Sequence, residues 1–172
     1  MAITRLNNSA VSAVSSLPNL ASLPSGIDTG KVGQVVQTTK IDLFSTNSTS
    51  YVDVTGVTAN ITPTATSSKI FVMVNGSSNM DDPGQQLYKL KLLRGTTALG
   101  ISSGQIFESY SASTIVPQSF TTNILDTPNS TDQQVYKLQV LSSGNGDYVF
   151  IGGYNSSAVK APTTLTLMEI LA

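Results

Sequence analysis

The chain has 172 residues, of which 40% are hydrophobic and 11% charged, and its formal net charge is −1. Its few basic residues are scattered, which excludes a nucleic-acid surface built on phosphate neutralisation. It has no His, Cys or Trp, which excludes Ser–His–Asp triads, cysteine nucleophiles, disulfides and thiolate–imidazole zinc sites. No apolar stretch is long enough to cross a membrane, the first 25 residues do not predict a secretory signal, and we expect no cofactor.

Residues 1–30 form the first predicted unit. They are rich in small residues and contain two Leu-Pro pairs, and proline does not continue a helix. Leu17, Leu20 and Leu23 recur at a spacing of three, which a purely solvated linker does not need. Two interpretations remain open: a flexible tail, or an extended arm that docks on a partner or a sister subunit through these leucines.

Residues 31–172 form the second predicted unit, a β domain. Val, Ile, Thr, Phe and Tyr make up about a third of the chain, and these residues suit pleated strands. The predicted strands are residues 32–40, 50–58, 69–75, 86–94, 97–101, 105–109, 115–125, 134–142, 147–152 and 163–171.

Alternation of apolar and polar residues indicates which face of each strand is buried. Tyr88, Leu90 and Leu92 point one way and Lys89 and Lys91 the other, and residues 134–142 repeat the pattern. Such strands have one face on a core and one in water. Turn signals separate the strands, and one of them, at residues 75–76, predicts that the third strand ends there. Short strands and frequent turns predict an all-β fold, an antiparallel β-sandwich or jelly roll.

The carboxylates give little sign of catalysis. A glycosidase needs two carboxylates facing each other across a cleft, and no spacing here identifies such a pair. Residues 79–84 are the most acidic patch; an exposed turn explains them better than a calcium loop does. We therefore expect a protein that is not an enzyme.

Glu169 is unusual, because it lies within the last predicted strand. It shares a face with Leu165, Leu167 and Leu171. Two readings are open: a position at the edge or rim of the sheet, or burial near a symmetry axis with a pairing partner such as a lysine. On the second reading, Glu169 and Leu167 are candidate subunit-interface residues.

Tyrosines in the predicted loops are candidates for contact with a receptor. Tyr110 and Tyr154 lie in the stretches 102–114 and 143–157, which with 76–86 are expected at the far end of the domain. Exposed tyrosines stack on sugars or anchor protein partners, although most serve as core or rim residues. A carbohydrate-binding module is thus an alternative function, weakened by the absence of Trp.

Residues 30–172 resemble a domain frequent in structural proteins of tailed bacteriophages, above all marine phages that infect cyanobacteria. The order of several short segments carries the resemblance, and a Leu-Pro-Ser-Gly-Ile-Asp-Thr-Gly run at residues 23–30 precedes them. The matching segments are residues 30–37 (GKVGQVVQ), 44–46 (FST), 51–56 (YVDVTG), 61–63 (ITP), 67–70 (SSKI), 92–95 (LLRG), 125–128 (LDTP), 136–140 (YKLQV) and 165–170 (LTLMEI).

The resemblance implies a virion protein with a trimeric jelly roll of the tumour-necrosis-factor or C1q kind. The first expectation is a homotrimeric tail fibre or tail-associated tip, anchored by residues 1–30 to other virion proteins and touching a host-surface glycan or protein. The alternative is a decoration protein or head fibre that stabilises the capsid. No catalytic residues come with the resemblance.

Overall fold

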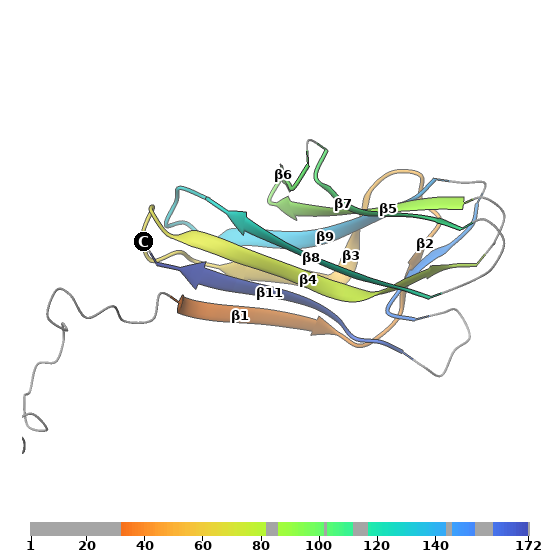
Figure 1. The fold of residues 1–172 in the computed structure, drawn as a ribbon, viewed down its shortest axis with the longest axis horizontal. Helices are drawn as coiled ribbons and strands as arrows, with labels where there is room; N and C mark the ends of the chain where they lie inside the picture. The colour runs from red at the N-terminus through yellow and green to blue at the C-terminus, as the bar shows by residue number, and fades with distance from the viewer. Residues whose placement is uncertain are drawn as a thin grey trace, which may run out of the picture. The chain divides into compact units, whose positions relative to one another are not determined.

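The computed structural model describes residues 32–81, 86–101, 103–111, 117–143, 146–153 and 160–171, with the backbone alone for Gln86, Tyr110 and Ser111. The regular structure within these ranges is β, arranged as two antiparallel sheets (Figure 1). The predicted all-β fold is therefore confirmed. The leucines of the predicted arm and Tyr154 lie outside the described residues.

The first sheet, which we call sheet A, has the order β1–β11–β4 and continues through β8 on the other side of β4. β10 pairs with β4 beyond the end of β11, and β2 pairs with β10. Its strands are β1 (Val32–Lys40), β2 (Phe44–Thr46), β4 (Lys69–Met80), β8 (Gln118–Asp126), β10 (Val149–Ile151) and β11 (Thr163–Ile170).

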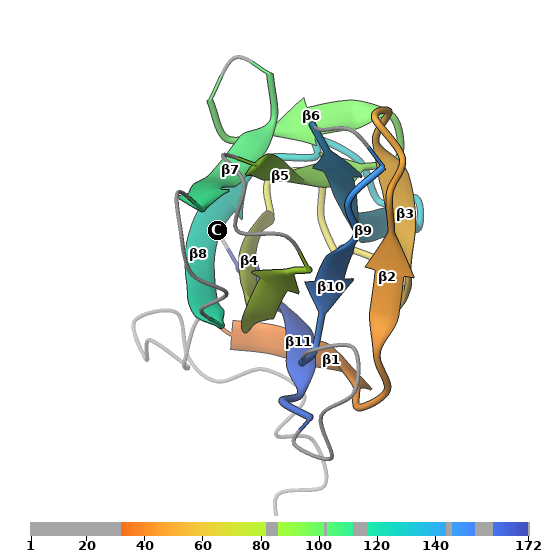
Figure 2. The same ribbon diagram turned by 90° about the vertical axis from the view of Figure 1, so that its right-hand side faces the viewer.

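The second sheet, sheet B, has the order β3–β9–β5, and β6 and β7 both pair with β5. Its strands are β3 (Val52–Ile61), β5 (Gln86–Arg94), β6 (Thr97–Leu99), β7 (Gln105–Ser111) and β9 (Gln134–Ser142). The chain crosses repeatedly between the sheets, and the last strand returns to lie between β1 and β4. This connectivity is jelly-roll-like, and Figure 2 shows the two layers from one end.

The core lies between the sheets, as the alternation predicts. Tyr88, Leu90 and Leu92 of β5 are buried, and so are Tyr136 and Leu138 of β9. Other fully buried core residues are Val54, Val57, Ile70, Val72, Val74, Val140, Val149, Ile151, Leu165 and Leu167. Burial of these side chains is the main stabilising contribution to the domain.

Strand extents follow the prediction closely in some places and not in others. β1, β5 and β9 cover the predicted residues 32–40, 86–94 and 134–142, whereas the three-residue strand β2 has no counterpart in the prediction. The turn predicted at residues 75–76 is wrong, because β4 continues through them to Met80. A Cβ at Gly76 would lie 2.7 Å from the Phe120 ring and from Thr163 Oγ1. Gly76 therefore lets Phe120 approach the backbone, and does not mark a turn.

An ion pair joins the two sheets. Arg94 of β5 donates to Asp126 Oδ2 of β8 over 2.7 Å, and the Tyr136 hydroxyl of β9 donates to the same oxygen, also over 2.7 Å. Burial raises the pKa of Tyr136 far above its ordinary value, and the neighbouring carboxylate of Asp126 adds to the effect. The phenol therefore stays a hydrogen-bond donor at any ordinary pH.

Candidate subunit interface

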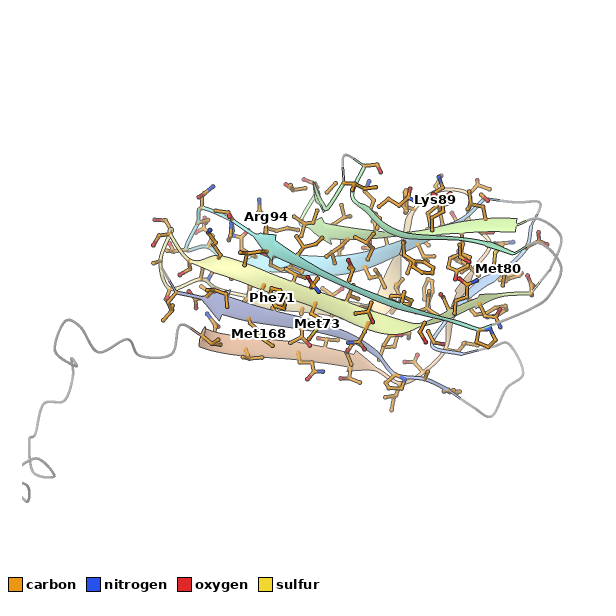
Figure 3. The ribbon with its side chains drawn as sticks, in the orientation of Figure 1. Phe71, Met73, Met80, Lys89, Arg94 and Met168 are labelled. Carbon is orange, nitrogen blue, oxygen red and sulfur yellow. The ribbon has the colours of Figure 1, made fainter. Side chains whose placement is uncertain are left out.

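An apolar row crosses the outer surface of sheet A. The register pairs Val35 of β1 with Met168 of β11, Met168 with Phe71 of β4, and Phe71 with Leu125 of β8. Neighbouring strands lie about 4.8 Å apart, so the row is roughly 14 Å long. Val35 is 56% exposed and Leu125 52%, although both are large hydrophobic residues. Figure 3 shows Phe71, Met73 and Met168 gathered on this side of the molecule.

Further rows flank the apolar row, and all but one of their residues are uncharged. Gln37, Thr166, Met73 and Asn123 form the next row along the strands, and Thr39, Thr164, Asn75 and Thr121 the one after it. On the other side lie Val32, Ile170 and Lys69. We call these fifteen residues together the sheet A face. Lys69 is the one charged residue among them.

The outer surface of sheet B has a different character. Lys137 pairs with Asp53 over 2.9 Å, Lys89 pairs with Glu108 over 3.4 Å, and Lys91 lies 5.0 Å from the centre of the Tyr51 ring. Covering such charges removes their hydration, which costs more than new contacts readily return. The sheet A face carries almost no such penalty, so of the two outer sheet surfaces that the structure describes it is the better suited to a protein contact.

The sequence carries a signal for this face. Residues 70–74 are a continuous apolar run, Ile-Phe-Val-Met-Val. A strand with one wet face alternates, whereas a continuous run is typical of a strand covered on both sides. In the structure Ile70, Val72 and Val74 enter the core, while Phe71 and Met73 remain partly exposed. Our sequence analysis missed both as interface candidates.

Leu167 and Glu169, the predicted interface residues, lie inside the sandwich. Both are 0% exposed in a single copy of the chain. Their side chains have no surface to offer a second copy, so we move the candidate interface to the outer side of the same strand, where Met168 points. Tyr110 lies in β7, where its backbone pairs with Leu87, and its receptor role stays a prediction.

The Glu169 carboxylate is held by neutral groups and not by a lysine. Thr64 donates to Oε1 from its backbone nitrogen over 2.6 Å and from its hydroxyl over 2.7 Å, and Gln34 Nε2 donates to Oε2 over 2.8 Å. Burial by itself raises the pKa of Glu169, but the hydrogen bonds outweigh it and lower the pKa to about 2. This anion ties β1 and β11 to the loop after β3.

Within the described ranges, no cluster of acidic side chains has a composition that could hold a metal ion. The same residues include no helix with the length and hydrophobicity needed to span a bilayer.

Known protein families and curated proteins yield no match to this chain. Among solved structures, a T13 particle of infectious bursal disease virus is similar at a TM-score of 0.43 and 14% identity, over 88% of this chain and 40% of that one. The VP2 subviral particle of the same virus is similar at a TM-score of 0.34 and 17% identity, over 81% of this chain and 38% of that one. The chain thus spans well under half the length of these proteins. At these values the likeness assigns neither a family nor a role.

Proposed function

We propose that this protein is a non-enzymatic structural subunit of a virion, located on the shell as a decoration protein or head fibre, and that it works as a homotrimer. The sheet A face carries the proposal. Its apolar row and its near absence of charge suit permanent contact with other copies of the chain. Residues 1–30 are, in this proposal, the arm that docks on another virion protein.

The fold and the sequence resemblance support the same proposal. Jelly rolls recur in viral capsid proteins, although they also occur in lectins, so the fold alone decides no function. The resemblance to structural proteins of tailed phages selects the virion among these settings. Its other implication, a tail fibre, gains no support from a fold that recurs in capsid proteins, and the shell is the location that we propose.

Particles purified from the virus that encodes this chain test the location. Mass spectrometry of the particles should detect the protein, and immunogold labelling should decorate heads at many points. Label confined to the tail tip would restore the tail-fibre interpretation, and absence of the protein from washed particles would refute a virion role.

Light scattering tests the homotrimer. The chain mass is 18.0 kDa, so the purified protein should have about three times that mass. Met168→Glu places a charge in the middle of the apolar row and should yield monomers, because each contact would then bury an unpaired carboxylate. Thr55→Glu, at an exposed position of β3 in sheet B, is the matched control and should keep the parent mass. A parent protein that stays monomeric at all concentrations would contradict the proposal.

A further inference from the structure

A second apolar surface adjoins the sheet A face. A cleft of about 430 Å³ opens between β7 of sheet B and β8 of sheet A. Ile101, Ile106, Phe107 and Ile124 supply its apolar lining, and Glu108 and Asn123 lie among its polar residues. Ile101 is 67% exposed, which among the large hydrophobic residues that the structure describes is second only to Ile41.

The cleft lies where two sheet edges meet. In the described part of the chain β7 pairs with β5 alone and β8 with β4 alone, so each has one side without a partner strand. Figure 2 shows β7 and β8 side by side along one flank of the sandwich. Exposed edges flanked by apolar side chains promote uncontrolled pairing unless something covers them.

We propose that the cleft of one copy is covered by the sheet A face of the next copy, so that the subunits join head to tail. This inference rests on the proposed function, which places the sheet A face against another copy of the chain but does not say which surface of that copy it meets. Two copies joined face to face about a twofold axis would cover the row of Phe71 and Met168 but leave both clefts open. A head-to-tail contact covers both apolar surfaces with one interface.

The position of β8 favours a closed ring. Asn123 of β8 belongs to the sheet A face through its pairing with Met73, and it also lines the cleft. The two surfaces are therefore adjacent and not opposite. Head-to-tail contacts close into a ring when the planes of the two surfaces meet at about 120° for three copies or about 90° for four, whereas opposite, parallel surfaces give an open filament. Adjacent surfaces that share a strand therefore favour a closed ring over an open filament.

Charge favours contact between the two different surfaces. The charged residue of the sheet A face is Lys69, an exposed lysine at the start of β4. The charged residue lining the cleft is Glu108, whose side chain is 42% exposed and pairs with Lys89 of the same copy over 3.4 Å. A head-to-tail contact can add Lys69 of the next copy to this pair, whereas a face-to-face contact offers Lys69 no carboxylate among the residues of the sheet A face.

Ring geometry also indicates which positions meet. Because β8 belongs to both surfaces, it lies nearest the ring axis, and β1, at the other side of the face, lies farthest from it. β1 of one copy should therefore meet the β7 side of the next copy's cleft, which includes Ile101. Val35 and Ile101 are both well exposed, so cysteine at either position leaves the core intact.

The native chain has no cysteine, which allows a direct cross-linking test. Val35→Cys and Ile101→Cys are made separately in the full-length protein and treated with a short bismaleimide, alone and mixed after subunit exchange. Each variant alone should remain uncross-linked, and the mixture should give a covalent dimer on denaturing gels. The double variant should give a covalent closed oligomer. Thr55→Cys on sheet B, mixed with either variant, is the control and should give no dimer.

Light scattering of the same samples distinguishes a failure of the proposed function from a failure of the head-to-tail arrangement. A monomeric mass would refute self-association and with it the proposed function. An oligomeric mass with dimers of Val35→Cys alone would establish a face-to-face contact and overturn the head-to-tail arrangement, leaving the proposed function intact. An oligomeric mass without a cross-linked dimer from the mixture of the two variants would also overturn the head-to-tail arrangement.

Discussion

The buried carboxylate of Glu169 should make this fold depend on pH in a way that one substitution removes. The side chain is 0% exposed, and its hydrogen bonds lower its pKa to about 2 from an ordinary value of 4.5. This difference corresponds to roughly 3 kcal/mol of the free energy of unfolding. Since the folded pKa is the lower one, the contribution is complete above the unfolded pKa of 4.5 and is lost as the pH falls toward 2.

Glu169→Gln keeps the size of the side chain and removes its ionisation. One amide oxygen can still accept from Thr64, but the amide nitrogen then faces the Gln34 nitrogen, which is also a donor. Near neutral pH the variant should lose about 3 kcal/mol, and the difference from the parent should shrink as the pH approaches 2.

Urea unfolding at a series of pH values and a fixed protein concentration measures the difference. Asp53→Asn is the control, since the Asp53 side chain is 51% exposed and lies outside both proposed contact surfaces, so it should contribute far less. Parallel pH curves for the parent and Glu169→Gln would refute the reasoning, and so would equal losses in the two variants.

Three further predictions concern other parts of the chain. Asp126→Ala should lower the free energy of unfolding in urea by about 2–3 kcal/mol, because it leaves Arg94 and Tyr136 without their shared acceptor. Asp53→Ala is the control: the Asp53 side chain is 51% exposed, and its loss should cost no more than about 1 kcal/mol. Equal costs would contradict a stabilising role for the Arg94–Asp126 ion pair. Gly76→Ala should lower stability by about 1–3 kcal/mol, because its Cβ meets Phe120 and Thr163 Oγ1 at 2.7 Å; an unchanged melting temperature would contradict this crowding. Deletion of residues 2–25 should preserve the oligomeric mass and abolish incorporation into particles; normal incorporation would refute the docking arm.

The sequence predicts most of the strands because their signals are local. Alternation in residues 86–94 and 134–142 assigns each side chain to a face, and the same residues form β5 and β9. The prediction failed at Gly76, where a glycine that normally signals a turn is retained because Phe120 packs against it. That contact joins residues 44 positions apart along the chain, and no local pattern records it.

The candidate interface shows most clearly which features the sequence determines and which only the tertiary structure decides. Composition and periodicity determined an all-β chain without His- or Cys-based chemistry. The apolar run at residues 70–74 is typical of a strand that is covered on both sides. Tertiary structure alone decided that Val35, Met168, Phe71 and Leu125 form one row, because strand register brings together residues from four separate stretches of chain. It also decided that Glu169 faces inward to neutral donors. Hydrogen-bond partners of a buried group depend on which loop closes over it, and the spacing of residues within one strand carries no information about that loop.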